Sequence, residues 1–118
     1  MPGFISEERL TYGSWRAFER ALARLVQHAG FKDVTLVGGA GDHGADVVAT
    51  MQGKRWVLQA KYRYSGGVDS AGAREALQAA SEYNADVSVV AANSYFYADA
   101  YNFQKERKDI GFDLRLWD

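Results

Sequence analysis

The chain has 118 residues, of which 47% are apolar and 14% aromatic, and we expect residues 1–118 to form one folded domain rather than a disordered chain. It has no cysteine, so disulfides, thiolate zinc sites and thiol nucleophiles are excluded. Fourteen Lys and Arg against fifteen Asp and Glu leave a net charge of −1, without the basic excess typical of a free-standing nucleic-acid binder.

Apolar residues spaced by three, four and seven predict a first helix that begins at Trp15 and stops at Gly30. Ser14 is suited to cap its N-terminus, and glycine is typical of a helix C-terminus. Glu19 lies at the edge of the apolar face, because it follows Trp15 by four positions. Basic residues recur at every fourth position on the far side of this helix, at Arg16, Arg20 and Arg24.

The remaining pattern predicts strands and helices in alternation. We expect strands over 33–37, 45–50, 55–62, 86–92 and 112–117, helices over 70–83 and 97–108, and a glycine-rich loop over 38–44. The order is αβββαβαβ, which predicts an α/β fold with a single mixed β-sheet flanked by helices.

The glycine-rich loop resembles a dinucleotide-binding fingerprint over residues 39–44. That fingerprint binds a pyrophosphate only when it opens a helix, and here β-prone residues follow it. We therefore predict a turn with positive-φ residues and no nucleotide cofactor.

A tight hairpin is predicted over residues 51–54, with Gln52 and Gly53 as its tip or with all four residues in the loop. Either turn gives a register that places Asp46 opposite Gln59. Lys61, two residues beyond Gln59, shares the same face. Burying a carboxylate and an ammonium among valines is costly unless they pair or bind something. The spacing leaves two interpretations open: a structural Asp46–Lys61 ion pair on a half-solvated face, or a site for chemistry. Carboxylate and amide oxygens suit Mg²⁺, and an adjacent lysine can orient or deprotonate an attacking water or stabilise developing negative charge.

Two stretches of the sequence, Gly-Asp-His-Gly-Ala-Asp-Val-Val at 41–48 and Val-Leu-Gln-Ala-Lys-Tyr at 57–62, resemble the core of the Mrr-like restriction endonucleases. These belong to the PD-(D/E)XK nuclease superfamily, in the variant with Gln in place of the middle acid. The resemblance extends over almost the whole chain, through Phe18-Glu19, Gly30-Phe31, Glu75-Ala76-Leu77 and residues 91–94 and 114–118. It implies a restriction-endonuclease-like fold and metal-dependent hydrolysis of DNA phosphodiester bonds.

The resemblance also implies a role for each residue of the motif. Asp46 matches the principal metal-ligand acid, Gln59 the second ligand position and Lys61 the catalytic lysine. The implied cofactor is Mg²⁺, for which Mn²⁺ is expected to substitute.

Two further acids match the family pattern. Glu19 matches the acid carried by the first helix, where it would contact the metal or a water, although an exposed pairing with Arg16 or Arg20 stays open. Asp42 recurs in the pattern too, and we interpret it as a cap for loop amides.

DNA is the expected partner, and a local basic patch, a metal ion or a second subunit must hold it because the net charge is slightly negative. We expect phosphate contacts from one of two basic sets, with His43 bordering the site: Arg16, Arg20 and Arg24, or Lys54, Arg55 and Arg63. Cutting both strands needs two active sites, so a homodimer or a larger nuclease complex is expected.

The sequence therefore predicts a Mg²⁺-dependent deoxyribonuclease that acts as an endonuclease. The alternative is a DNA-binding or assembly module of the same fold with weak or lost catalysis, because members of the family often carry a separate DNA-binding domain and we identify none here. A substitution at Asp46 or Lys61 would favour that alternative, and both residues are intact. A purely structural subunit leaves Asp46, Gln59 and Lys61 unexplained. We find no membrane helix and no signal peptide, so we expect a cytoplasmic protein.

Overall fold

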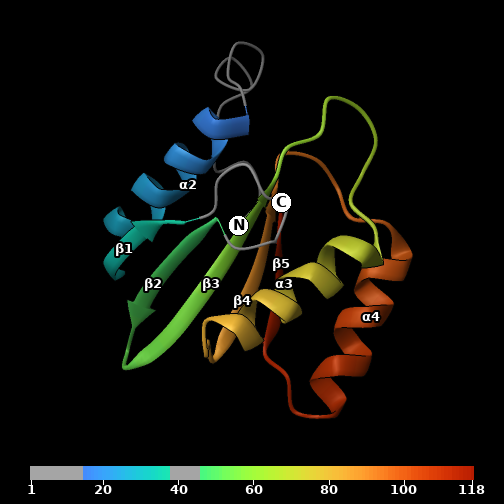
Figure 1. Cartoon of the computed structure of the whole chain (residues 1–118). Coiled ribbons are helices and arrows are strands. Elements are labelled where there is room, and N and C mark those ends of the chain that lie inside the picture. Colours follow the sequence, from blue (N-terminus) through green and yellow to red (C-terminus); the bar gives the residue numbers. More distant parts are fainter. Residues whose placement is uncertain (1–14, 38–45) are drawn as a thin grey trace.

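The computed structural model describes residues 15–37 and 46–118, in which helices and strands build one mixed sheet with helices on both faces (Figure 1). The helices are α2 (Trp15–His28), α3 (Ser70–Glu82) and α4 (Ala98–Asp109). The strands are β1 (Lys32–Leu36), β2 (Val47–Met51), β3 (Lys54–Lys61), β4 (Val87–Ala92) and β5 (Leu114–Trp117).

Each helix and strand predicted from the sequence is present in the described residues, with ends that differ by two positions or fewer. α2 buries Phe18, Leu22 and Val26, the face that the periodicity predicted. Gly30, with a φ of +99°, ends the helix as expected. The proposed cap Ser14 lies outside the described residues, as do Asp42, His43 and the glycine-rich loop.

The strand order in the sheet is β1-β2-β3-β4-β5, as Figure 1 shows from one edge to the other. β1, β2 and β3 pair antiparallel, whereas β3, β4 and β5 pair parallel. Parallel neighbours need long crossovers, which α3 and α4 supply. The hairpin turn has positive φ at both Gln52 and Gly53, as a type I′ turn requires, and the predicted register is confirmed from Met51–Lys54 to Val47–Leu58.

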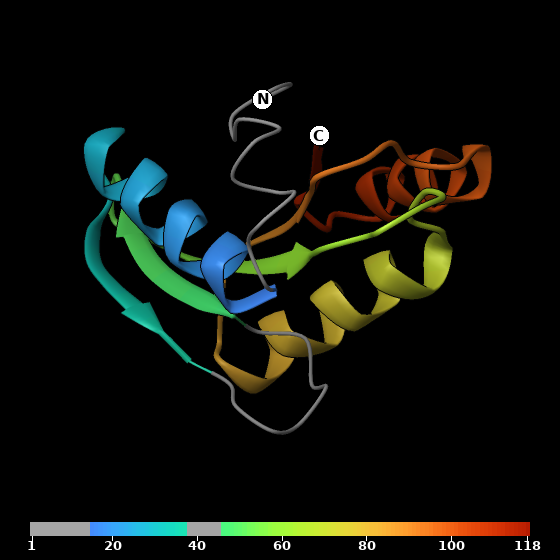
Figure 2. The same cartoon turned by 90° about the horizontal axis from the view of Figure 1, so that it is seen from above.

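The alternation of side chains along β3 divides the molecule into two layers. Trp56, Leu58 and Ala60 pack with α2 in one core cluster, and Val57 packs with Ala79 of α3 in another. Figure 2, seen from above, shows α2 and α3 on opposite sides of the strands. Gln59 and Lys61 therefore face α3.

The helices are short. They have 14, 13 and 12 residues, and across the described ranges we find no helix with the length and apolar character that crossing a membrane demands. α3 begins at a capped N-terminus, where the Asp69 side chain accepts a hydrogen bond from the Ala71 amide at 3.1 Å. This cap fixes the start of the helix that covers Gln59 and Lys61.

Candidate functional site

Asp46 lies one residue before the start of β2, and it does not continue the regular hairpin pairing. Its amide donates to the Leu58 carbonyl at 3.2 Å, and its Oδ2 accepts the Ala60 amide at 2.7 Å. A strand amide points along the plane of the sheet, so the Asp46 carboxylate lies beside the backbone of β3. The expected position on the Gln59 face is therefore wrong in detail: Asp46 lies between the two faces, where groups from both layers can reach it.

Glu19 reaches Asp46 from α2, and both carboxyl groups are only 7% exposed. Burial raises the pKa of Glu19 to about 7, and the hydrogen bond to Asp46 and its negative charge add to the rise, against Arg16 and Arg20. Burial also raises the pKa of Asp46, opposed by the hydrogen bonds from Glu19 and the Ala60 amide. The alternative of an exposed Glu19 paired with arginines is therefore wrong. Two buried acids in contact share a proton, or they share a cation.

Glu75 of α3 joins Gln59 and Lys61 on the other face of the sheet. Its Oε2 accepts from Gln59 Nε2 at 3.0 Å and from Lys61 Nζ at 2.5 Å. Among the described side chains, Lys61 thus forms its ion pair with Glu75, which contradicts the structural Asp46–Lys61 pair left open by the sequence. The Lys61 charge still lowers the pKa of Asp46, and that of Glu75 raises it, so the two layers are electrostatically coupled.

The hydrogen bond to Glu75 also sets the orientation of the Gln59 amide. An ionised carboxylate only accepts hydrogen bonds, so Gln59 must turn its NH₂ group toward Glu75 and keep Oε1 for another partner. Gln59 is 4% exposed, and its Oε1 is buried with no hydrogen-bond donor among the described residues. This oxygen is available as a ligand.

The role of Glu75 was missed by sequence reasoning, although Glu75-Ala76-Leu77 belonged to the family resemblance. A usable signal existed: Glu75 is a charged residue on a helix whose sheet-facing positions are small, at Gly72, Ala73, Ala76 and Ala79. Gly72 also leaves room for Val68, whose Cγ1 lies 2.8 Å from the place a Cβ would take there, and it lies beside Lys61, whose Cε is 3.5 Å from the same place.

A divalent cation fits the donors that are present. Within residues 15–37 and 46–118, no three His, Cys, Asp or Glu side chains form a ready-made metal cluster. The available oxygens are the two buried carboxyls of Asp46 and Glu19 and the unpartnered Gln59 Oε1. Few protein ligands, all of them oxygen, are what Mg²⁺ and Mn²⁺ use.

The candidate DNA-contacting residues fall in two separate places. Arg16, Arg20 and Arg24 are exposed along α2, and Arg63 lies two residues after Lys61, the last residue of β3. Lys54 and Arg55 begin β3 instead, and Lys54 lies seven residues before Lys61, which is about 23 Å along a strand. His43 lies outside the described residues. The structure thus places Lys54 and Arg55 at the opposite end of β3 from Arg63, although the sequence predicts these three residues as one basic set.

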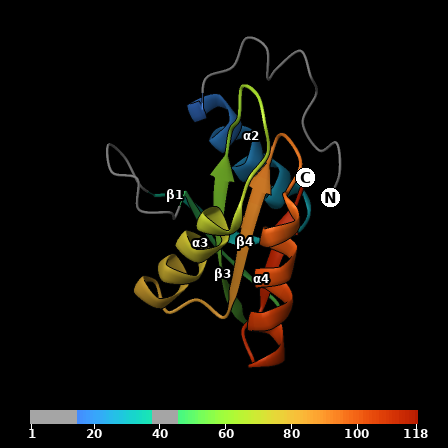
Figure 3. The same ribbon diagram turned by 90° about the vertical axis from the view of Figure 1, so that its right-hand side faces the viewer.

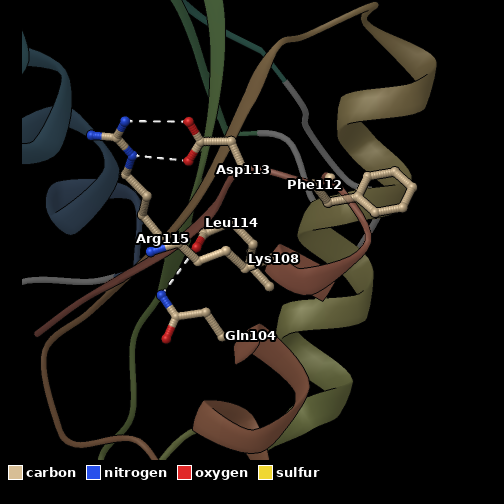
Figure 4. Close-up of a pocket in the computed structure, with 7 residues that line it drawn as sticks. Gln104, Lys108, Phe112, Asp113, Leu114 and Arg115 are labelled. Carbon is tan, nitrogen blue, oxygen red and sulfur yellow. Dashed lines mark hydrogen bonds and ion pairs between the residues drawn. The ribbon is translucent and has the colours of Figure 1, made fainter. Parts of the chain in front are cut away.

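A second group of polar side chains lies at that opposite end, around a cavity of about 530 Å³ between α4 and the start of β5 (Figure 4). Arg115 pairs there with Asp113 at 3.1 Å, and Gln104 Nε2 donates to the Leu114 carbonyl at 3.0 Å. The paired side chains are 46% and 38% exposed. This cavity contains none of the predicted site residues.

Comparison with known proteins places the chain in a family. Residues 10–118 match the Mrr_cat family of restriction endonucleases. No curated protein sequence is similar enough to count as a relative. Among solved structures, the crystal structure of the protein of unknown function AF1548 has a similar fold, with a TM-score of 0.61 and 19% identity, over 84% of this chain and 56% of that one. The chain therefore spans little more than half of that protein, and the likeness shows the fold alone. The family match covers most of the sequence and contains Glu19, Asp46, Gln59 and Lys61, and the chain belongs to the Mrr_cat restriction endonuclease family.

Proposed function

We propose that this chain is a metal-dependent endonuclease that hydrolyses DNA phosphodiester bonds. The observation that carries the proposal is the contact between two buried acids, Asp46 and Glu19, which need a proton or a cation between them. The buried Gln59 Oε1 has no hydrogen-bond donor among the described residues, and the charge of Lys61 acts on Asp46. Buried, incompletely paired ionisable groups cost stability, and functional sites are where such costs are found.

Asp46, Glu19 and the Gln59 Oε1 would hold the cation. When bound, it would neutralise phosphate charge and acidify water. In the reaction a water molecule would lose a proton as its oxygen bonds to phosphorus, one P–O ester bond would break, and the departing alkoxide would take up a proton. Lys61 would direct its ammonium toward the phosphate oxygens, where negative charge develops.

Glu75 would act through its neighbours as a positioning residue. By accepting from both Gln59 Nε2 and Lys61 Nζ, it turns the Gln59 oxygen toward other partners and holds the lysine in one place. A mobile lysine would have to be ordered at each turnover, so this fixed arrangement favours the reaction.

Plasmid cleavage tests the proposal directly. Supercoiled plasmid and linear duplex are incubated with the protein in Mg²⁺, Mn²⁺ or EDTA, and nicked and linear products are separated on a gel. We expect cleavage with either metal and none in EDTA, and a loss of at least about 100-fold in Asp46→Asn and in Lys61→Ala.

Matched controls come from exposed residues of α4. Asp109→Asn removes a carboxylate and Lys105→Ala an ammonium from the surface, and both are expected to cut at the parental rate. A folded Asp46→Asn protein that still cuts at the parental rate would overturn the assignment. Metal-independent DNA binding without any cleavage by the parent would favour the DNA-binding module instead.

The proposal includes the partners of the reaction. DNA is the substrate, the chain acts in the cytoplasm as a single nuclease domain, and a homodimer or larger complex supplies the second active site for double-strand cutting. Light scattering that finds only monomers at micromolar concentration, together with double-strand cutting, would count against the dimer.

A further inference from the structure

Three tyrosines stand exposed where β3 and β4 end. Tyr64 is 91% exposed, Tyr95 53% and Tyr97 44%, and we refer to these three residues as the tyrosine surface. Tyr64 meets the ring of Tyr62 edge-on at 6.2 Å, and Tyr95 meets Tyr97 edge-on at 5.4 Å. Edge-on contacts order a ring while leaving part of its face open.

The backbone beneath the tyrosine surface is held by hydrogen bonds between the two strand exits. The Gly67 amide donates to the Tyr97 hydroxyl at 3.1 Å, and Val68 pairs with Phe96 in a parallel bridge. The Tyr95 ring lies so close to Gly67 that an added Cβ would be 2.6 Å from it. The rings of Tyr95 and Tyr97 are therefore positioned before any ligand arrives, which lowers the entropic cost of binding.

A second pair of bonds ties the strand exits together nearer the site. The Asn93 side chain accepts from the Arg63 amide at 2.7 Å and donates to the Arg63 carbonyl at 2.8 Å. Figure 3 shows the loops that follow β3 and β4 rising at the same end of the molecule. The two loops that carry the tyrosine surface are therefore joined at Arg63, which is a cationic residue.

The tyrosine surface adjoins the proposed site. Both Val68, which anchors the surface, and Lys61 lie next to Gly72: a Cβ there would be 2.8 Å from the valine side chain and 3.5 Å from Lys61 Cε. Tyr64 follows Lys61 by three positions, which is at most about 11 Å of extended chain. DNA whose phosphate meets Lys61 is therefore within reach of the Tyr64 ring.

We propose that the tyrosine surface stacks against unpaired bases, so that the preferred substrate carries a single-stranded segment next to the scissile phosphate. This inference rests on the proposed nuclease function. Inside a duplex the faces of the bases are covered by their neighbours, and only unpaired bases offer a face to an aromatic ring.

The first measurement is binding in EDTA, where no cleavage occurs. Fluorescence anisotropy compares a single-stranded thymidine oligonucleotide with a duplex of the same length, at one fixed salt concentration. We expect Tyr64→Ala to weaken binding to the single strand roughly 5- to 150-fold and to leave duplex binding within about twofold. Tyr64→Phe, which keeps the ring, is expected to retain binding.

Phe112→Ala is the matched control, because Phe112 is an aromatic residue of 50% exposure at the opposite end of the sheet. It is expected to leave both affinities unchanged. Equal effects of Tyr64→Ala and Phe112→Ala would overturn the proposal, as would an effect of Tyr64→Ala on duplex alone. A fall in molecular mass of Tyr64→Ala by sedimentation, with unchanged DNA binding, would identify a protein interface instead and also overturn it.

Cleavage then separates this inference from the nuclease proposal. With Mg²⁺ or Mn²⁺, the parent is expected to cut duplexes with a flap or gap at least about tenfold faster than blunt duplex, and Tyr64→Ala is expected to remove that preference. Cleavage of blunt duplex alone, unaffected by Tyr64→Ala, would defeat the inference and support the nuclease. Ring-dependent binding of single strands with no cleavage of any DNA would defeat the nuclease and support the tyrosine surface.

Discussion

The two ends of the parallel strands differ in how they treat charge. At the start of β5, Asp113 and Arg115 pair where both side chains are more than a third exposed, beside an open cavity. At the exit of β3, Asp46 and Glu19 are almost completely buried, and burial raises the pKa of both carboxyl groups. Asp46 raises the pKa of Glu19 further, whereas the hydrogen bond from Glu19 opposes the rise at Asp46. The comparison teaches that a cavity with charged walls is a weaker sign of function than buried acids that lack a full set of partners.

The largest contrast between the two ends should come from metal binding. A metal at 100 times its Kd adds about 2.7 kcal/mol to the free energy of unfolding, or roughly 10 °C in Tm for a chain of this size. We expect Mg²⁺ or Mn²⁺ to raise the Tm of the parent and of Asp113→Asn by this amount, and that of Asp46→Asn hardly at all.

The same melts test the structural interpretation of Asp46. A purely structural role predicts that Asp46→Asn loses about 3–5 kcal/mol of stability without metal, because a buried partner is left unpaired. A metal ligand predicts instead that Asp46→Asn melts at or above the parental Tm in EDTA. If the metal raised the Tm of Asp46→Asn as much as that of the parent, the two ends of the sheet would not differ in metal binding.

The second contrast is in pH dependence, measured in EDTA. The pKa of Glu19 in the folded protein is about 7, against 4.5 for the ordinary side chain. Between these two pH values the folded state binds more protons than the unfolded state, so the free energy of unfolding falls as the pH rises from 4.5 to about 7. Glu19→Gln cannot ionise. Its Tm is therefore expected to exceed that of the parent by several degrees more at pH 8 than at pH 5.

Glu82→Gln, on an exposed position of α3, is the control for loss of a carboxylate. Scanning calorimetry at four or five pH values measures the difference. A Glu19→Gln protein whose Tm follows that of the parent at every pH would show that Glu19 ionises freely.

The third prediction concerns how Glu75 positions Lys61 and Gln59, at the end of the sheet that contains the proposed site. Glu75→Gln keeps the size of the side chain but loses the charge that holds Lys61 and orients Gln59. We expect kcat to fall about tenfold with little change in KM for DNA, and the metal-induced Tm shift to shrink. The stability cost is expected to be below about 1 kcal/mol, because Glu75 is 43% exposed.

Glu82→Gln again serves as the control, since it lies on the same helix. Steady-state kinetics on a short DNA substrate provide kcat and KM separately. A Glu75→Gln protein with a raised KM and an unchanged kcat would assign Glu75 to DNA binding rather than to positioning.

The smallest expected effect separates the basic residues of the two ends. Each phosphate contact contributes about 0.9 to the slope of log affinity against log salt on duplex DNA. We expect the double substitution Arg16→Gln and Arg20→Gln to reduce that slope by about two, and Lys54→Gln with Arg55→Gln to leave it unchanged. A salt titration of anisotropy measures both, and the reverse result would place the DNA at the hairpin end.

Local patterns in the sequence were sufficient to predict the elements and to select most residues of the candidate site. The apolar face of α2, the hairpin turn at Gln52 and Gly53 and the register that follows all depend on residues close together in the chain. The motif residues Asp46, Gln59 and Lys61 came from the same hairpin and from the family resemblance. Glu19 could be placed only at the edge of a helix face.

Only the tertiary structure decided how those residues meet. β2 begins at Val47, two residues after the predicted start, so the Ala60 amide is left to bind the Asp46 carboxylate in the plane of the sheet. The packing of α3 on β3 brings Glu75, rather than Asp46, to Lys61. Periodicity predicts which face of an element is buried, because it depends on neighbours three or four residues away. The partner across the core depends on how far each element is shifted and rotated, and that is set by contacts distant in sequence.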